Sequence, residues 1–203
     1  MLSNFFFSPE LLATLSAPLF LTLKVSLVSA LGFCFLGVPL AYWCARRESV
    51  LSKAVLFLAT LPLIFPPIAL GYLLMLLLGQ QGFFGSWAMR VFDMRLLFSE
   101  GSVFLAGTIA GMPLVVRPIK EVLSSARLLA LEEAASVLGV EGVKRFRLIT
   151  LPLIKNTLLA SIMMGVARAS GEVGVTLMLG GNIENRTATL SLEIYNAVAR
   201  GDF

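Results

Sequence analysis

Long apolar stretches separated by polar segments dominate this chain of 203 residues. A helix that crosses a lipid bilayer needs about 20 mostly apolar residues. Four stretches meet or approach that length, and they cover residues 17–45, 54–78, 101–116 and 156–179. We therefore expect an all-α fold, a polytopic membrane helical bundle with about four spans. The pattern predicts one transmembrane domain over residues 1–203, with a polar loop at 117–155.

Two features inside the predicted spans are unusual for membrane helices. Pro62, Pro66 and Pro67 lie in the middle of the second span, where each removes a backbone donor. That span is expected to bend, either to line a pathway or as a packing kink. Arg168 and Glu172 are four residues apart in the fourth span, on one predicted helical face. Charges are costly in lipid, so the two form either an ion pair at a subunit interface or part of a transport route. Two neighbouring glycines allow close backbone approach, Gly171 and Gly174.

Basic residues gather in the loops on one side of the predicted membrane. Residues 46–53 and 117–155 hold ten lysines and arginines, whereas residues 79–100 and 180–203 hold four. The positive-inside rule places the richer side in the cytoplasm. We therefore expect a multi-pass protein of the cytoplasmic (inner) membrane with its N-terminus outside. This topology also accounts for the net charge of +4, so we expect membrane lipid and no nucleic acid as a partner.

The composition supports a membrane protein and excludes several kinds of chemistry. Hydrophobic residues make up 58% of the chain and charged residues 14%, whereas soluble domains hold about 45–50% and about 25%. Histidine is absent, which excludes a Ser-His-Asp triad within the chain. With two cysteines and no histidine, a zinc, iron–sulfur or haem site is not expected. We therefore expect neither catalytic residues nor a metal site.

The loop at 117–155 contains a pattern of two helices joined by a turn. Residues 124–138 predict a helix, because leucine and alanine recur at spacings of three and four along one face. Gly139 follows, and glycine commonly ends a helix in the left-handed conformation. A second amphipathic segment runs over residues 143–152. We expect these segments to form a compact projection on the cytoplasmic face.

The spacing of residues in this loop resembles the EAA signature of the permease subunits of ATP-binding-cassette (ABC) importers. The matching positions are Glu133, Ala134, Ala135, Gly139, Ile149, Leu151 and Pro152. The resemblance implies that the loop couples the subunit to a cytoplasmic ABC ATPase by docking in a groove on it. It also implies the type I importer permease fold, with five or six spans per subunit, and a permease homodimer that works with two ATPases.

Other segments resemble the permeases of oxyanion importers. Residues 61–85 are similar to the second span and following loop of molybdate permeases, and residues 167–174 and 181–195 are similar to molybdate permeases as well. Sulfate and thiosulfate permeases share the Arg–Gly–Glu and Gly–Asn segments, so these two segments do not separate the oxyanions. The resemblance implies import of a tetrahedral oxyanion, molybdate ahead of sulfate, thiosulfate or tungstate. It also implies a periplasmic or extracellular oxyanion-binding protein as a partner, and an outer gate region with three matching residues, Gly181, Asn182 and Tyr195.

The chain departs from the family pattern in two respects. Ile183-Glu184-Asn185 and Leu190-Ser191-Leu192 stand where the family often has Ile-Pro-Gly and Leu-Pro, so the outer gate region is expected to differ in shape. Related permeases also continue into one more span, so the chain is expected to lack the last membrane span.

Three classes of protein remain to be distinguished. A transport subunit without chemistry of its own is favoured, because the chain has no Gly-x-x-x-x-Gly-Lys-Ser/Thr phosphate loop, and the resemblance assigns ATP and Mg²⁺ to the partner ATPase. An ion-coupled secondary transporter needs an inverted repeat and titratable groups near the membrane midplane, but Glu172 is the single carboxylate in a predicted span. A membrane enzyme is disfavoured by the missing histidine and the lack of clustered carboxylates.

Overall fold

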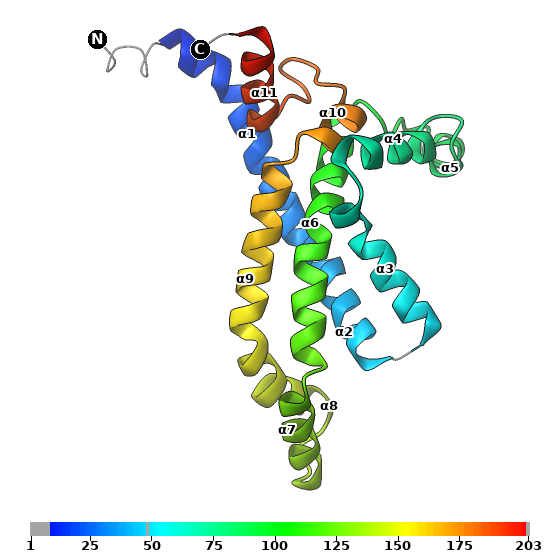
Figure 1. Ribbon diagram of the computed structural model, residues 1–203, viewed down its shortest axis with the longest axis vertical. Coiled ribbons are helices and arrows are strands. Elements are labelled where there is room, and N and C mark those ends of the chain that lie inside the picture. The colour runs from blue at the N-terminus through cyan, green and yellow to red at the C-terminus, as the bar shows by residue number, and fades with distance from the viewer. Residues whose placement is uncertain (1–8, 48, 202–203) are drawn as a thin grey trace.

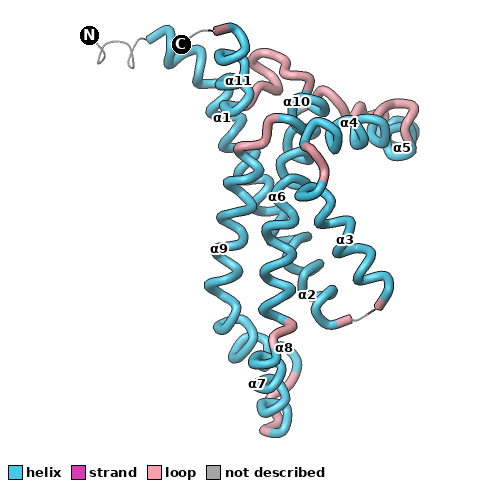
Figure 2. The backbone as a smooth tube through the Cα atoms, viewed as in Figure 1, coloured by secondary structure: helices cyan, strands magenta, loops and turns pink. Residues whose placement is uncertain are grey.

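The computed structural model describes residues 9–47 and 49–201, with side chains from residue 15 onward, and these residues form only helices, turns and loops. The helices, in chain order, are α1 (Pro9–Gly32), the π-helical turn η2 (Phe33–Gly37), α2 (Val38–Arg46), α3 (Val50–Ile64), α4 (Pro67–Leu78), α5 (Phe83–Phe92), α6 (Glu100–Leu123), α7 (Ala126–Val137), α8 (Gly142–Arg145), the π-helical turn η3 (Phe146–Thr150), α9 (Leu151–Ser170), α10 (Gly174–Gly180) and α11 (Leu190–Arg200). They make an elongated bundle with α7 and α8 at one end and α4, α5, α10 and α11 at the other (Figure 1 and Figure 2).

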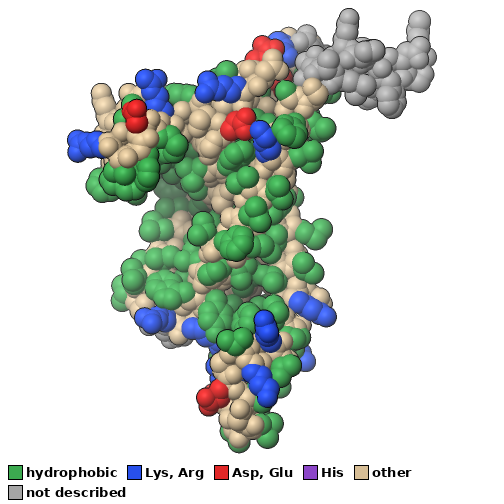
Figure 3. Space-filling view, turned by 180° about the vertical axis from the view of Figure 1, so that it is seen from behind, with side chains coloured by type: hydrophobic (Ala, Val, Ile, Leu, Met, Phe, Trp, Pro, Cys, Tyr) green, Lys and Arg blue, Asp and Glu red, His purple; other side chains and the backbone are tan. Residues whose placement is uncertain are grey.

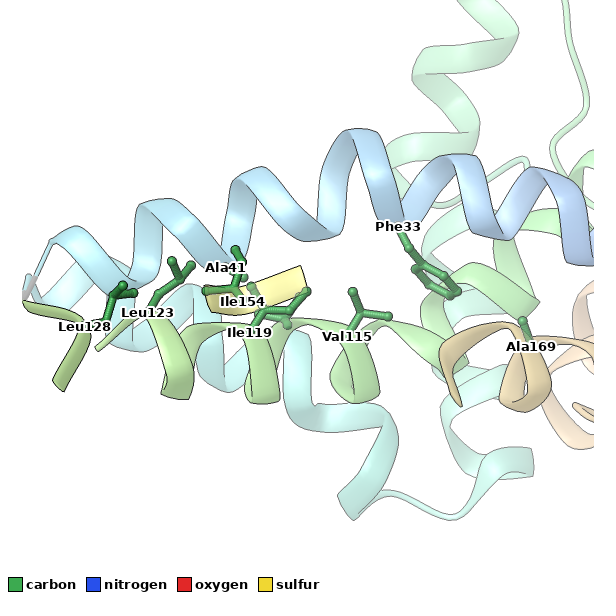
Figure 4. Packing of buried hydrophobic residues seen from close by; sticks show 9 residues of the cluster. Phe33, Ala41, Val115, Ile119, Leu123, Leu128, Ile154 and Ala169 are labelled. Atoms are coloured by element: carbon green, nitrogen blue, oxygen red, sulfur yellow. The ribbon is translucent and has the colours of Figure 1, made fainter. Parts of the chain in front are cut away.

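Helix α6 is the buried centre of this bundle. It packs along α9 and also contacts α1, α2, α3 and α10. An apolar cluster follows these contacts (Figure 4), and its buried members are Phe33, Ala41, Val115, Val116, Ile119, Leu123, Leu128, Ile154 and Ala169. Because lipid chains are as apolar as leucine, close van der Waals packing rather than apolar burial alone must hold such helices together.

Two glycines allow α6 and α9 to pack closely. A Cβ atom on Gly111 would lie 2.4 Å from the carbonyl oxygen of Gly165 and 2.6 Å from Cζ of the Phe33 ring. A Cβ atom on Gly165 would lie 2.6 Å from a methyl group of Val115. Only glycine fits at both positions, and the ring of Phe33 fills the space beside them.

The outside of the bundle is suited to lipid. Three helical segments are long and apolar enough to cross a membrane, and α4 with α5, bent by 44°, makes a fourth if that pair counts as one span. The three are Leu15–Arg46, Glu100–Leu123 and Gly142–Ser170. Figure 3 shows apolar side chains over the middle of the molecule and charged side chains gathered towards its two ends. The prediction of an all-α membrane bundle is confirmed.

The predicted span 54–78 is two helices rather than one bent helix. α3 ends at Ile64 and α4 begins at Pro67. Phe65 and Pro66 between them are extended, with ψ angles of 142° and 135°. The ring of a proline disfavours the α conformation for the residue before it, and Phe65 and Pro66 each precede a proline. The prolines therefore break the helix completely.

The helix of the third predicted span, α6, extends beyond its predicted limits. The apolar stretch predicted a span at 101–116, but α6 continues to Leu123. Pro113 and Pro118 lie inside the helix without ending it, and exposed Arg117 begins its polar extension. Seven residues of the predicted loop 117–155 are therefore helical continuation of the core.

The helix of the fourth predicted span, which includes α9, begins and ends closer to the N-terminus than predicted. The span was predicted at 156–179, but a continuous helical segment runs over Gly142–Ser170 and α10 is separate from it. Two glycines in the sequence Gly171-Glu172-Val173-Gly174 lower the helix propensity at the break. Glu172 consequently lies beyond the end of α9, not on a helical face shared with Arg168.

Two contacts tie the ends of other elements to α1. The backbone N–H of Leu190, where α11 begins, donates to Oγ1 of Thr22 at 2.9 Å. Lys24 Nζ forms an ion pair with Oε2 of Glu100, the first residue of α6, at 2.9 Å. These contacts fix α11 and the start of α6 at the end of the bundle opposite α7.

Candidate functional site

Residues 125–145 form a helical knob that projects from one end of the bundle and consists of α7, a tight turn and α8 (Figure 1). The turn contains Gly139, which has a φ of +75°. The N–H groups of Gly139 and Val140 donate to the carbonyl oxygens of Ser136 and Ala135 at 3.0 and 2.9 Å. This pair of bonds is a Schellman ending, which requires a left-handed residue. The predicted left-handed turn at Gly139 is therefore confirmed.

A buried carboxylate joins the knob to the bundle. Glu132 of α7 is 5% exposed, and its Oε1 accepts hydrogen bonds from Nη2 of Arg46 and Oγ1 of Thr150, both at 2.6 Å. Arg46 ends α2, and Thr150 directly precedes α9. Hydrogen bonds to ionised groups are about twice as strong as neutral ones. The knob therefore cannot shift against α2 or α9 without breaking strong bonds.

The tip of the knob presents apolar side chains to its surroundings. Val137, Leu138 and Val143 are 87%, 81% and 71% exposed. Glu133 and Ala134 are exposed on the same helix. A group of exposed apolar side chains rimmed by polar residues marks a protein interaction site. The knob thus combines an exposed apolar tip with a base that is hydrogen-bonded to the bundle.

Two helix breaks meet near the other end of the molecule. A Cβ atom on Gly174, where α10 begins, would lie 2.7 Å from Cβ of Pro67, where α4 begins. A Cβ atom on Gly71, one turn further along α4, would lie 2.8 Å from Cβ of Met178. The two glycines allow α4 and α10 to pack closely. The structure therefore brings the predicted Gly174 together with the break at Pro66 and Pro67.

Arg168 and Glu172 form an ion pair across the end of α9. Nη1 of Arg168 lies 2.5 Å from Oε2 of Glu172, but this oxygen makes no hydrogen bond within the described part of the chain. Oε1 accepts a hydrogen bond from the N–H of Val175 at 2.9 Å. The side chain of Glu172 is 1% exposed and that of Arg168 33%. The carboxylate therefore caps α10 and holds it against the end of α9.

The predicted outer gate residues lie together at the end opposite the knob. Gly181 and Asn182 both have left-handed backbones, with φ of 72° and 50°. The side-chain amides of Asn182 and Asn196 exchange two hydrogen bonds, at 2.7 and 3.3 Å. Tyr195, next to Asn196 in α11, is exposed. An amide pair thus links the turn after α10 to α11.

A cavity of about 870 Å³ opens at the same end. It lies between α4, α5 and the segments around residues 94–99 and 183–186, and Arg95 and Arg186 are among its lining residues. Both arginines are exposed. Clefts lined by charge of one sign concentrate ions of the opposite sign, so this cavity favours anions.

The remaining predicted residues occupy more ordinary positions. Pro62 lies inside the last turn of α3, and Gly171 directly follows α9. Ile149 packs against the apolar cluster from η3, whereas Leu151 and Pro152 are exposed where α9 begins. Of these five residues, only Ile149 takes part in a contact described above, that with the apolar cluster.

The motif pattern missed the residue that anchors the knob. Glu133 matches the signature but is exposed, whereas Glu132 beside it is buried. A signal was present in the sequence, because Leu128, Glu132 and Ala135 follow the spacing of one helical face. All three are buried. A carboxylate on the apolar face of a helix indicates a partner of opposite charge elsewhere in the chain.

Comparison with protein families decides the class. The family described as "Binding-protein-dependent transport system inner membrane component" matches residues 37–198. The chain belongs to this family. The permease is therefore the non-catalytic, multi-pass inner membrane component of an ABC importer, and ATP is bound by the partner ATPase of such systems. Membership excludes the alternatives of an ion-coupled secondary transporter and a membrane enzyme.

Individual relatives of the permease belong to molybdenum and sulfate transport systems. It is 34% identical over 178 residues to the molybdenum transport system permease protein ModB of Haemophilus influenzae, covering 88% of this chain and 77% of that protein. It is also 34% identical over 179 residues to ModB of Escherichia coli K12, with the same coverage of 88% and 77%. The sulfate transport system permease protein CysW of Synechococcus elongatus is 32% identical over 177 residues, 87% of this chain and 61% of that protein.

Proposed function

We propose that the permease imports molybdate, with an ABC ATPase bound to the helical knob on its cytoplasmic side. The observation that carries the coupling role is the knob itself, whose tip is apolar and exposed while its base is bonded to α2 and α9. The choice of molybdate rests on the ModB relatives and on the resemblance of residues 61–85 to molybdate permeases.

Uptake by the reconstituted complex tests the cargo. The permease is placed in vesicles with its ATPase and oxyanion-binding protein, and uptake of labelled molybdate is measured with and without ATP. We expect ATP-dependent uptake that tungstate competes for and that excess sulfate leaves nearly unchanged. Sulfate or thiosulfate uptake that resists excess molybdate would instead assign the permease to those anions.

The proposed orientation puts the knob in the cytoplasm and the N-terminus outside. The ten-to-four excess of basic residues supports it, and the knob and α5 lie at opposite ends of the bundle (Figure 1). Single cysteines are introduced at Glu141 and Ser86 in a background without Cys34 and Cys44. We expect Ser86→Cys to react in intact cells and Glu141→Cys only after permeabilisation. Labelling of both from outside would refute this orientation.

Coupling is proposed to work through the buried carboxylate. Movement of the ATPase shifts the knob, and the bonds from Glu132 to Arg46 and Thr150 carry that shift to α2 and α9. Glu133 and Ala134 lie on the exposed side of α7 and are proposed to contact the ATPase. Glu133→Lys is expected to lower co-purification of the ATPase without changing the stability of the permease. An unchanged yield of ATPase would remove Glu133 from the contact.

The proposed assembly is a permease homodimer with two ATPases and an oxyanion-binding protein. The arginine-lined outer cavity and the linked turn at Gly181 and Asn182 support anion entry at the end opposite the knob. Tyr195 is proposed to belong to the same outer gate region. The mass of the purified complex, measured by native mass spectrometry, tests the stoichiometry, and a single permease chain per complex would contradict it.

Arg168 and Glu172 are proposed to hold α10 at the end of α9 rather than to line the route. The burial of Glu172 and its hydrogen bond to the N–H of Val175 support this role. Replacing one partner strands a charge and is damaging in either role. The double replacement Arg168→Met with Glu172→Gln keeps a side-chain oxygen for capping, so we expect assembly and molybdate uptake near wild type. Normal assembly with strongly reduced uptake would instead place the pair in the route.

A further inference from the structure

Three basic side chains surround a small cavity at the base of the knob. The cavity has a volume of about 160 Å³ and lies between the end of α2, the first turns of α3 and the end of α6. Arg47, Lys53 and Lys120 line it together with Ser124. None of its lining residues within the described part of the chain is acidic. The site is separate from the knob tip, the helix breaks and the outer cavity.

No carboxylate among residues 9–47 and 49–201 pairs with the cations at this cavity. The ion pairs among the described residues involve Lys24, Arg46 and Arg168 as the basic members. Arg47, Lys53 and Lys120 are in none of them, although Arg46 directly before Arg47 is paired with Glu132. Like charges that face one space repel each other, and an anion between them removes that repulsion. Within the described part of the chain, therefore, no carboxylate compensates the charge at this position.

A hydrogen-bond donor without a partner among the described residues also lines this cavity. Oγ of Ser124 is buried and has no hydrogen-bond partner within the described chain. A buried hydroxyl without a partner is costly, and a bound acceptor would satisfy it. The other hydroxyl at the cavity, that of Ser52, already donates to the carbonyl oxygens of Arg47 and Ser49.

The shape of the surroundings fits a group with a compact anionic head. One water takes about 30 Å³ in the liquid, so the cavity has room for a tetrahedral oxyanion group. Leu56 and Ala45 line part of its wall, and Val50 and Leu51 on the adjacent first turn of α3 are strongly exposed. Basic pockets between membrane helices on the cytoplasmic side are suited to phospholipid head groups.

We propose that this cavity binds a tetrahedral oxyanion group, through Arg47, Lys53, Lys120 and the hydroxyl of Ser124. The group is either the phosphate of an anionic phospholipid or a free oxyanion, since both offer the same oxygen atoms to the same donors. The proposal depends on neither the cargo nor the ATPase contact.

Two binding measurements on the assembled complex test the proposal and separate the sources. Native mass spectrometry follows retention of phosphatidylglycerol against phosphatidylcholine with the same acyl chains. Equilibrium dialysis of delipidated complex follows binding of labelled inorganic phosphate and molybdate. Lys53→Gln with Lys120→Gln removes two charges from the cavity. The matched control, Arg147→Gln with Lys155→Gln, removes two exposed charges from the same end of the molecule.

We expect one anionic group to bind per chain. The double cavity variant should lose about 25-fold in affinity for this group, because each charge near an anionic lipid surface contributes about fivefold. The control variant should bind with an affinity close to that of wild type. Preferential retention of phosphatidylglycerol that follows this pattern identifies the lipid, and dialysis that follows it identifies the free ion. Lys53→Gln alone, with an expected loss of about fivefold, serves if the double variant does not assemble. Equal losses in variant and control, or no binding of any probe, would overturn the site.

Discussion

The substitution Glu132→Ala tests whether the base of the knob depends on one carboxylate. It would leave the buried hydroxyl of Thr150 without its acceptor, which costs about 1–3 kcal/mol. It would also leave the guanidinium of Arg46 without its partner, and breaking a buried ion pair costs about 3–5 kcal/mol. The Arg46 side chain is 24% exposed, so water recovers part of the second loss. We expect a total loss in stability of about 3–6 kcal/mol.

Thermal unfolding of the purified permease in detergent measures this loss. For a chain of this size a loss of 1 kcal/mol lowers Tm by about 2–4 °C, so we expect Tm to fall on the order of 10 °C. Glu132→Gln keeps an oxygen acceptor and should lose less than Glu132→Ala. Glu133→Gln is the matched control, because its carboxylate is exposed one residue away, and its Tm should equal that of wild type.

The same variants separate coupling from stability. In the reconstituted complex, the number of ATP molecules hydrolysed per molybdate imported should rise in Glu132→Gln, because the bonds from the knob to α2 and α9 are weaker. A change in stability alone would lower the amount of active complex and leave this ratio constant. A Tm for Glu132→Ala within about 2 °C of wild type would refute the energetic argument, and an unchanged ratio in Glu132→Gln would refute the role in coupling.

Two further predictions concern glycines. Gly139→Val places a β-branched residue at a φ of +75°, at a cost of about 1–3 kcal/mol, and should reduce co-purification of the ATPase. Gly139→Asn should retain it, because asparagine tolerates this conformation. Equal yields of ATPase from both variants would show that the turn is not needed. Gly111→Ala would put a Cβ atom 2.4 Å from the carbonyl oxygen of Gly165 and should cost about 1–3 kcal/mol of stability. Gly101→Ala in the same helix has its nearest contact at 3.6 Å and should keep the Tm of wild type. Matching Tm values for the two variants would contradict the close packing.

The sequence was sufficient to predict the apolar helices and the helices of the knob, but it predicted neither α5 nor α11, nor where each helix stops. Apolar content identifies a stretch such as 54–78, yet it carries no information on the two extended residues at Phe65 and Pro66 that divide it. Conversely, α6 continues past Val116 although the apolar stretch ends there, and Arg117, the first residue of this continuation, is exposed. Local breakers and helix extensions depend on backbone conformation and tertiary packing, which hydropathy does not measure.

The knob was predictable in outline because its turn has a local cause. α7 ends at Gly139 through two local hydrogen bonds. The N–H of Gly139 donates to the residue three positions earlier, and the N–H of Val140 donates to the residue five positions earlier. The anchor at Glu132 was not predictable as a pair, because its partner Arg46 is 86 residues away. Arg168 and Glu172 do form an ion pair, but not on the shared helical face that their spacing predicted, because α9 ends at Ser170 between them.

The glycine contact between α6 and α9 divides the molecule into parts of different stiffness. Backbone touches backbone at Gly111 and Gly165, and the ring of Phe33 fills the remaining gap, so no flexible side chain is available to absorb sliding. Packed interiors transmit strain rather than deform, and α1, α6 and α9 should therefore act as a rigid rod. The extended residues Phe65 and Pro66 separate α4 from α3, and α4 packs closely on α10, so α4 and α10 should move together as one arm about this break. Reorientation during a transport cycle should change the angle of this arm while the distance between α6 and α9 stays constant.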